Sequence, residues 1–255
     1  MIADALRRAA AGFVTSARAA DPDRPVKATP GWCGADLVSH VAIECDRYRR
    51  ELEGDSDWSP HGTDIPATNR RALAARSDRE VERAAASIVA DVERYASLLA
   101  ERDPDTPSHH LDGGLLLAPR HAAGVLLGEL VVHRHDLDAA APIEREDAVA
   151  IVSGALHTMP GMLDADAARG LTATVEFRVR GAGTHTVHVA DGRATTTDGP
   201  ASGRRDAVLS VDPVGFLLLS YGRRGQLATV LRGQVLAWGR RLDKAFAFDR
   251  VFTRP

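Results

Sequence analysis

The spacing of apolar residues divides the chain into two parts. Up to about residue 165, apolar residues recur every three to four positions, which is the period of an amphipathic helix. The helices predicted from this period lie near 2–19, 34–53, 77–102, 119–140 and 145–164, the last interrupted at Pro160. The segments between them are polar and rich in glycine and proline. The first part is therefore predicted to be a helical bundle.

After residue 170 the apolar period changes to two, which predicts a sheet. The predicted strands are 172–180, 185–192, 193–199, 206–212 and 233–239, with a helical segment from Pro213 and a terminal helix over 242–252. Helices followed by a sheet predict an α+β protein of two domains, because each part needs a core of its own. We expect a bundle over 1–167 and a smaller α+β domain over 168–255, with the boundary near 165–171.

Composition and net charge restrict the partners and the compartment that we expect for the chain. A net charge of −3 offers no basic surface for nucleic acid. No apolar stretch approaches the roughly 18 residues of a membrane span, and the N-terminus reads as an amphipathic helix and not as a signal peptide. Two cysteines form no disulfide framework and suit a reducing compartment, so we expect a cytoplasmic protein. Of 32 basic residues only two are lysines, which suggests a high-GC genome.

One predicted helix carries a possible metal-binding pair. Glu129 and His133 are four residues apart and share a helix face, whereas His135 points nearly opposite. On the predicted helix 34–53, His40 lies in the inward stripe. Carboxylate and imidazole ligands on facing helices can build a metal site in a bundle core, and three ligands would leave a position open. The alternative is a surface helix with an ordinary core histidine.

The resemblance to a known family bears on this choice. "TPGWCGADLVSHVAIECDRY" at 29–48 resembles the W-x3-DLV-x-H segment of the mycothiol-dependent maleylpyruvate isomerase family, which belongs to the DinB-like metalloenzymes. "GELVVHRHDLDAA" at 128–140 is similar to the family's second motif, E-x3-H-x2-DL. "DAVLSVDPVGFLLLSYGRRG" and "LRGQVLAWG" resemble its small C-terminal domain, which is related to sterol-carrier folds. Nearly the whole chain is covered.

The resemblance implies an up-and-down four-helix bundle with a divalent metal ion, usually zinc, on His40, Glu129 and His133. It also implies mycothiol as the thiol cofactor and an actinobacterial source, which agrees with the arginine-rich composition. A free thiol has a pKa of about 8.5, and coordination to a cation deprotonates it. The metal would thus supply a thiolate for attack on a small electrophile.

Two pairs of arginines are candidate binding residues. Arg223 and Arg224 lie where the family's C-terminal domain supplies an arginine that is important for activity, and we favour Arg223 as the catalytic one. An arginine there would clamp a carboxylate of a bound small molecule; the alternative is a solvated turn. Arg70, with its neighbour Arg71, is a weaker candidate for the same role.

Three functions remain open at this point. The first is thiol-dependent isomerisation of a cis-enoyl dicarboxylate. The second is S-transfer in a biosynthetic pathway or in detoxification, and the third is a non-catalytic protein that binds a metal and a ligand. The partners expected are a small electrophile and a thiol, with neither nucleic acid nor membrane.

The other histidines are expected to have no part in the metal site. His61, His109, His110 and His121 fall in or near loops around the bundle and are expected mostly to face solvent. His185 and His188 are three apart in one predicted strand and point to opposite faces, which argues against a metal shared by these two.

Overall fold

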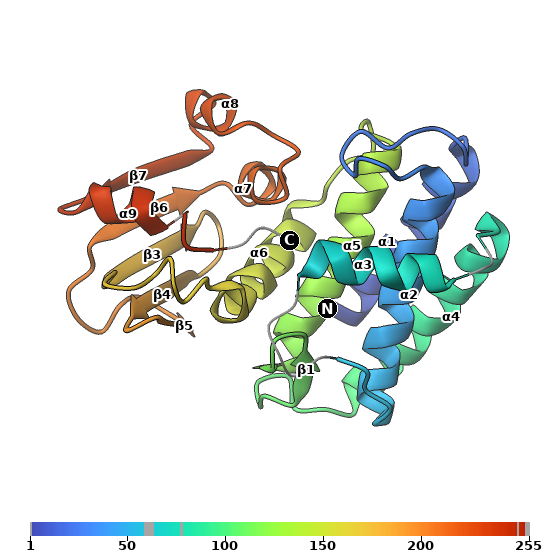
Figure 1. Cartoon of the computed structure of the whole chain (residues 1–255), viewed down its shortest axis with the longest axis horizontal. Coiled ribbons are helices and arrows are strands. Elements are labelled where there is room, and N and C mark those ends of the chain that lie inside the picture. The colour runs from blue at the N-terminus through green and yellow to red at the C-terminus, as the bar shows by residue number, and fades with distance from the viewer. Residues whose placement is uncertain (1, 59–63, 77–78, 249, 253–255) are drawn as a thin grey trace. The chain divides into compact units, whose positions relative to one another are not determined.

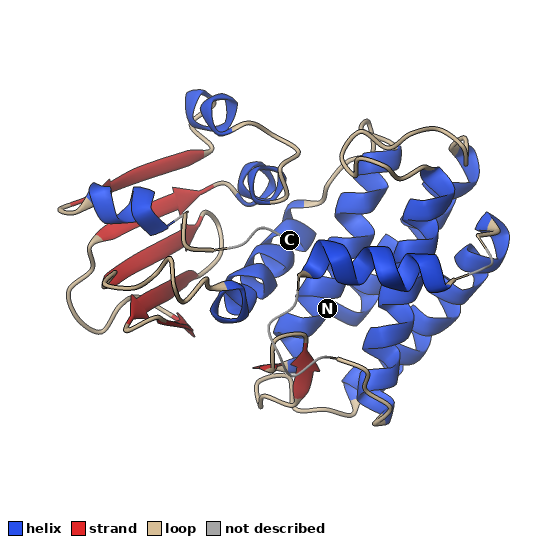
Figure 2. Ribbon diagram, in the orientation of Figure 1, coloured by secondary structure: helices blue, strands red, loops and turns tan. Residues whose placement is uncertain are grey.

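The chain forms two compact units, Met1–Ala150 and Ile151–Pro255 (Figure 1). The computed structural model describes residues 2–58, 64–76, 79–248 and 250–252. One unit consists chiefly of helices and the other contains a five-stranded sheet (Figure 2). The prediction of an α+β protein with a helical N-terminal part and a sheet-containing C-terminal part is therefore confirmed.

The division between the units falls earlier than the predicted boundary near 167. The last helix of the helical run, α6 (Arg145–Thr158), contains the dividing point. Its second half belongs to the sheet unit because the Thr196 hydroxyl donates a hydrogen bond to the carbonyl of Leu156. The short 3-10 helix that follows, Met159–Met162, also packs against a strand. Because residues 145–164 have a helical period, the sequence pattern predicted that this whole segment belongs to the bundle. Independent folding of the two parts stays a prediction.

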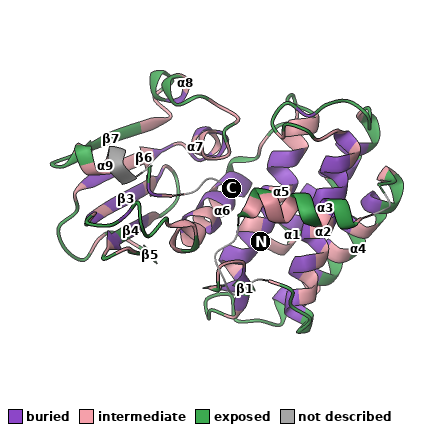
Figure 3. Cartoon of the chain, viewed as in Figure 1, coloured by how far each residue is buried: buried purple, intermediate pink, exposed green. Residues whose placement is uncertain are grey.

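Four long helices form the bundle of the first unit. They are α1 (Ile2–Ala19), α2 (Gly34–Glu53), α4 (Val81–Ala100) and α5 (Pro119–Leu137). Each contacts two others, in the cyclic order α1, α4, α2, α5. Their apolar stripes face inward and are buried, as Figure 3 shows by colour. Large apolar side chains such as Leu6, Phe13, Leu37 and Leu126 fill this core.

Two smaller elements of the bundle unit have no counterpart in the prediction. Helix α3 (Ile65–Ala75) packs against α2, and its Asp64 side chain caps it by accepting a hydrogen bond from the backbone of Ala67. Strands β1 (His109–Leu111) and β2 (Leu115–Leu117) form a short antiparallel hairpin. Both elements are too short to show a clear period in sequence.

The second unit is built on a mixed sheet in the order β5-β4-β3-β6-β7, in which only β3 and β6 are parallel. Its strands are β3 (Ala173–Val179), β4 (Thr184–Ala190), β5 (Arg193–Asp198), β6 (Ala207–Val211) and β7 (Val235–Gly239). Its further helices are α7 (Pro213–Ser220), α8 (Gln226–Leu231) and α9 (Leu242–Phe248). The five predicted strands are all present.

The terminal helix is shorter than predicted. It ends at Phe248, residue 249 lies outside the described residues, and Phe252 forms an isolated β-bridge with Leu163. The backbone N–H of Asp164 donates to the carbonyl of Val251. This pairing holds the chain extended where the apolar pattern predicted helix.

Candidate metal centre

Helices α2 and α5 bring the three predicted metal ligands together. The backbone N–H of Cys33 donates to the Asp36 carboxylate, so a capping contact defines the start of α2. Pro119 stands in the first turn of α5, where its missing N–H costs no helical hydrogen bond. The two helices pack against each other. His40 on α2 thereby faces Glu129 and His133 on α5.

The three side chains converge on one carboxylate oxygen. His40 Nε2 lies 3.4 Å from Glu129 Oε2, and His133 Nε2 lies 3.2 Å from the same oxygen. Ligand atoms of one tetrahedral zinc ion lie roughly 3.3 to 3.6 Å apart, because each is about 2.0 to 2.2 Å from the ion. One ligand atom from each residue lies within 4.8 Å of the other two. Two imidazoles and a carboxylate at this spacing fit a divalent cation.

Asp136 orients one of the ligands. Its carboxylate Oδ2 lies 2.9 Å from His133 Nδ1, and its side chain is only 1% exposed. Because a carboxylate accepts, Nδ1 carries a proton toward Asp136, and Nε2 is the ring nitrogen that faces the cluster. Carboxylates commonly hold metal-binding histidines in this way. The sequence analysis assigned Asp136 no role, although it is the aspartate of the motif E-x3-H-x2-DL.

The charges of this cluster are coupled. Burial opposes ionisation of Glu129, but hydrogen bonds and charge from His133 and His40 outweigh it and hold the pKa of Glu129 well below its usual range. Burial also opposes protonation of His133, yet its hydrogen bonds to Asp136 and Glu129 raise its pKa to about 9. Without a cation, His133 is therefore protonated at neutral pH, and a metal ion would have to displace the proton on Nε2.

Aromatic and polar side chains of α2 and the loop before it surround the cluster. The ring of Trp32 packs against His40 with centroids 4.9 Å apart. Glu44, one turn after His40, is buried, and burial raises the pKa of its carboxyl group. The Arg47 guanidinium lies 3.5 Å from Glu44 and 3.1 Å from Asp112. Glu44 is buried, whereas its neighbour Ile43 is partly exposed.

Solvent reaches the cluster beside Glu129. Its side chain is 21% exposed, compared with 5% for His40 and 11% for His133. His135 lies on another side of α5, where it lines a separate hollow together with Arg8 and Asp147. It is not among the clustered ligands.

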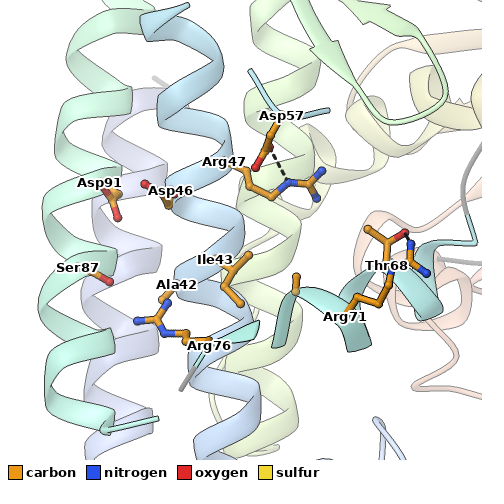
Figure 4. A pocket seen from close by; sticks show the side chains of 11 residues that line it. Ala42, Ile43, Asp46, Arg47, Asp57, Thr68, Arg71, Arg76, Ser87 and Asp91 are labelled. Atoms are coloured by element: carbon orange, nitrogen blue, oxygen red, sulfur yellow. Dashed lines mark hydrogen bonds and ion pairs between the residues drawn. The ribbon is translucent and has the colours of Figure 1, made fainter. Parts of the chain in front are cut away.

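A polar pocket of about 450 Å³ lies beside α2, next to α3 and α4 (Figure 4). Its size is typical of small-molecule sites. The charged side chains that line it are Asp46, Arg47, Asp57, Arg71, Arg76 and Asp91. In Figure 4 the ion pair between Arg47 and Asp57 borders this pocket, and it measures 3.3 Å. Arg47 thus contacts both the pocket and the Glu44 carboxyl next to the metal ligands.

The predicted arginines have different positions. Arg71 on α3 lines the pocket and its guanidinium donates to the Thr68 hydroxyl, whereas Arg70 is exposed and is not among the lining residues. Arg223 and Arg224 lie between α7 and α8 in the sheet unit. Arg223 donates to the carbonyl of Tyr221, and Arg224 donates to the side chain of Gln234 at 2.8 Å. The binding roles of all these arginines stay predictions.

The expectation that the loop histidines mostly face solvent is wrong for two of them. His109 is 0% exposed and His121 is 4% exposed, because the hairpin folds onto the bundle and His121 lies inside α5. The side chain of His110 is 61% exposed, as expected, and His61 lies outside the described residues.

Comparisons with known proteins identify a family for the helical part and a similar fold for the chain. Residues 3–138 match the family described as the mycothiol maleylpyruvate isomerase N-terminal domain. A crystal structure of the mycothiol-dependent maleylpyruvate isomerase is 16% identical, with a TM-score of 0.50; 92% of this chain and 91% of that chain are covered. A histidine-to-alanine mutant of that enzyme gives a TM-score of 0.51 at 15% identity and the same coverage. At these identities the two structures show a shared fold.

No curated protein matches the chain significantly. Within the described ranges, none of the helices combines the length and the apolar character that a membrane crossing needs.

Proposed function

The chain belongs to the mycothiol maleylpyruvate isomerase N-terminal domain family, and we propose that it is a metal-dependent enzyme that uses mycothiol to act on a small electrophile. The observation that carries the proposal is the convergence of His40 and His133 on one oxygen of Glu129. Maleylpyruvate, which the related crystal structures name, is the first substrate to test.

We infer that His40, Glu129 and His133 hold one divalent cation, with Zn²⁺ as the first candidate. Two neutral imidazoles and one carboxylate leave a Zn²⁺ site with a net charge of +1 and a coordination position open. When bound, the cation would supply Lewis acidity that lowers the pKa of a coordinated thiol.

Three residues would shape the surroundings of the open coordination position. Asp136 would keep a proton on Nδ1 of His133 when a cation displaces the proton on Nε2, so that Nε2 becomes the ligand. Trp32 covers His40 and reduces access of water to that side. The greater exposure of Glu129 leaves the approach for a thiol on its side of the cluster.

The pocket in Figure 4 is the candidate binding place for the polar part of the thiol or the substrate. It offers donors from arginines and acceptors from aspartates, a mixture that suits a polyhydroxylated or carboxylate-bearing ligand. Binding energy from such remote groups would orient the reacting sulfur. Arg223 stays a separate candidate for binding a carboxylate.

Cobalt-substituted full-length protein tests the proposal directly. Addition of mycothiol should produce a sulfur-to-cobalt charge-transfer band and release about one proton per site at pH 7, because the ligand must be deprotonated. Mercaptoethanol at the same concentration should do so weakly, since it lacks the remote groups. If mycothiol changes neither the spectrum nor the proton count, the thiol function is wrong, and a carrier or a water-based metalloenzyme becomes the better account.

Product analysis separates the two reactions. With mycothiol and maleylpyruvate, isomerisation yields the trans isomer and leaves the free thiol concentration unchanged. S-transfer consumes the thiol and yields a conjugate that mass spectrometry detects. Arg223→Ala should reduce turnover in either case while the metal content stays the same.

A further inference from the structure

A hollow of about 500 Å³ lies beside α5, on a different face of this helix from the metal ligands. Val131, Arg134 and His135 line it, because residues three and four apart share one face of a helix. Glu129 and His133 share another face and are not among the lining residues. Side chains of α1 and of the start of α6 complete the walls, and all of them belong to the helical unit. We call this cavity the α5 hollow.

Arg134 gives the α5 hollow a positive charge without a matching acid. Within the described ranges, its guanidinium makes neither an ion pair nor a hydrogen bond, and its Nε is buried. Arg8, which also lines the hollow, differs because it lies 3.6 Å from Asp147. A partly buried charged donor without an acceptor is costly, and an acceptor brought by a ligand would remove that cost.

Helix α1 makes room for this guanidinium. The two helices pack against each other, and Arg134 lies against Gly12. A Cβ atom at position 12 would be 2.9 Å from Nη1 of Arg134 and 3.1 Å from its Cζ, which is closer than van der Waals contact. Glycine inside a helix lowers stability relative to alanine. The space that Gly12 leaves is used by a charged group with no acidic partner in the described part of the chain.

His135 adds a second polar group to the hollow. Its Nδ1 is buried and has no hydrogen-bond partner among the described residues. The rest of the wall includes aliphatic side chains, which are Ala9, Val131 and Ile143. The hollow therefore combines polar donors with an apolar surface, as sites for small organic molecules commonly do.

Acidic side chains limit the charge of a ligand. Glu144 and Glu146 line the hollow and are exposed, whereas Asp147 is buried and paired with Arg8. A second negative charge on the ligand would be repelled by these carboxylates. One negative charge, opposite Arg134, is what the hollow accommodates.

We propose that the α5 hollow is a second small-molecule site, which binds an aliphatic monocarboxylate. The carboxylate would accept hydrogen bonds from Arg134 and His135, since a planar guanidinium can donate two parallel bonds to it. The carbon chain would pack against Val131 and Ile143. The site shares no residue with the metal centre or with the pocket beside α2. It therefore does not depend on the proposed thiol chemistry.

Isothermal titration calorimetry of the full-length chain with three matched probes tests the proposal. Hexanoate should bind with about one equivalent and a Kd in the millimolar range or tighter. Hexanamide has the same shape without the charge and should bind at least about 10-fold more weakly. Adipate has the same number of carbon atoms and a second carboxylate, and it should also bind more weakly than hexanoate because of the acidic side chains.

Variants locate the binding site. Arg134→Gln should weaken hexanoate binding at least about 10-fold, because it removes the charge-assisted hydrogen bonds. Gly12→Ala should weaken it too, since the new Cβ displaces the guanidinium while every lining side chain stays the same. Arg7→Gln is the matched control, because Arg7 precedes Arg8 on α1 but is already paired with Glu93 at 2.7 Å. It should bind as wild type does.

The outcomes that overturn the proposal are distinct. They are the absence of hexanoate binding to wild type at millimolar concentration, equal affinity in wild type and folded Arg134→Gln, and equal affinity for hexanoate and adipate. Hexanoate bound at the metal centre would be lost in His133→Ala and kept in Arg134→Gln, which also overturns it. Circular dichroism checks folding. Should Arg134→Gln not fold, Arg134→Lys takes its place; it keeps the charge but loses the planar fork, so it should bind hexanoate more weakly.

Discussion

Two buried clusters beside α2 contain histidines whose pKa values are shifted in opposite directions. Near the middle of the helix, His40 meets Glu129 and His133, and polar atoms converge. Near its C-terminal end, Tyr48 meets Tyr95 and His109, and aromatic rings pack edge to face or tilted. We call the first the metal centre and the second the aromatic cluster.

The pKa values of the two histidines show what differs. Burial is the largest influence on both. In the aromatic cluster it prevails and lowers the pKa of His109 to about 4. In the metal centre the carboxylates of Asp136 and Glu129 outweigh it and raise the pKa of His133 to about 9. Among the described residues neither ring nitrogen of His109 has a hydrogen-bond partner. Burial alone therefore does not make a binding site; convergent opposite charge does.

The largest expected effect comes from removing a ligand of the metal centre. His133→Ala should abolish zinc binding at micromolar concentration because two ligands alone hold the ion weakly. Equilibrium dialysis with metal analysis measures this. His135→Ala, two positions along the same helix, should retain the ion. Equal losses in both variants would contradict the assignment.

The aromatic cluster should make the free energy of unfolding depend on pH. His109 has a lower pKa folded than unfolded, where it is about 6.5, so its contribution to stability is complete above pH 6.5 and is lost as the pH falls toward 4. The shift corresponds to about 3 kcal/mol. The fall in unfolding free energy between pH 7 and pH 4 should be smaller in His109→Phe by about this amount. Urea denaturation of metal-free protein measures the difference; parallel curves for the two proteins would contradict it.

A smaller effect is expected from the residue that orients His133. Asp136→Asn keeps a hydrogen-bond acceptor but removes the charge, so zinc affinity should fall about 10- to 100-fold. Competition titration with a chromophoric chelator gives the affinity. Asp138→Asn is the control, since Asp138 is exposed and bonds only locally to the backbone of Ala140. An unchanged affinity in Asp136→Asn would mean that this carboxylate does not tune the centre.

The smallest effect concerns the pocket. Arg71→Gln should raise KM for the thiol or the substrate about five-fold, or about 1 kcal/mol, with little change in kcat, because it removes binding away from the reacting atoms. Arg70→Gln should change neither, as Arg70 does not line the pocket. Steady-state kinetics decides; a larger effect from Arg70 would favour the sequence-based choice.

Much of the fold could be predicted because its long elements repeat a period many times. The four bundle helices and five strands were located to within a few residues. Helix α3 and the β1–β2 hairpin were missed, since too few residues carry their pattern. The division between the two compact units lies within α6, which has one helical period throughout, so periodicity offers no signal for it; the predicted domain boundary near 167 stays a prediction.

The sequence by itself determined that Glu129 and His133 share a helix face, because a spacing of four residues is local and follows from the helix repeat. Only the tertiary structure decided that α2 packs against α5, so that His40 points to the same carboxylate oxygen. Local periodicity determines which way a side chain faces, whereas contacts between distant segments depend on packing that no single stretch of sequence contains.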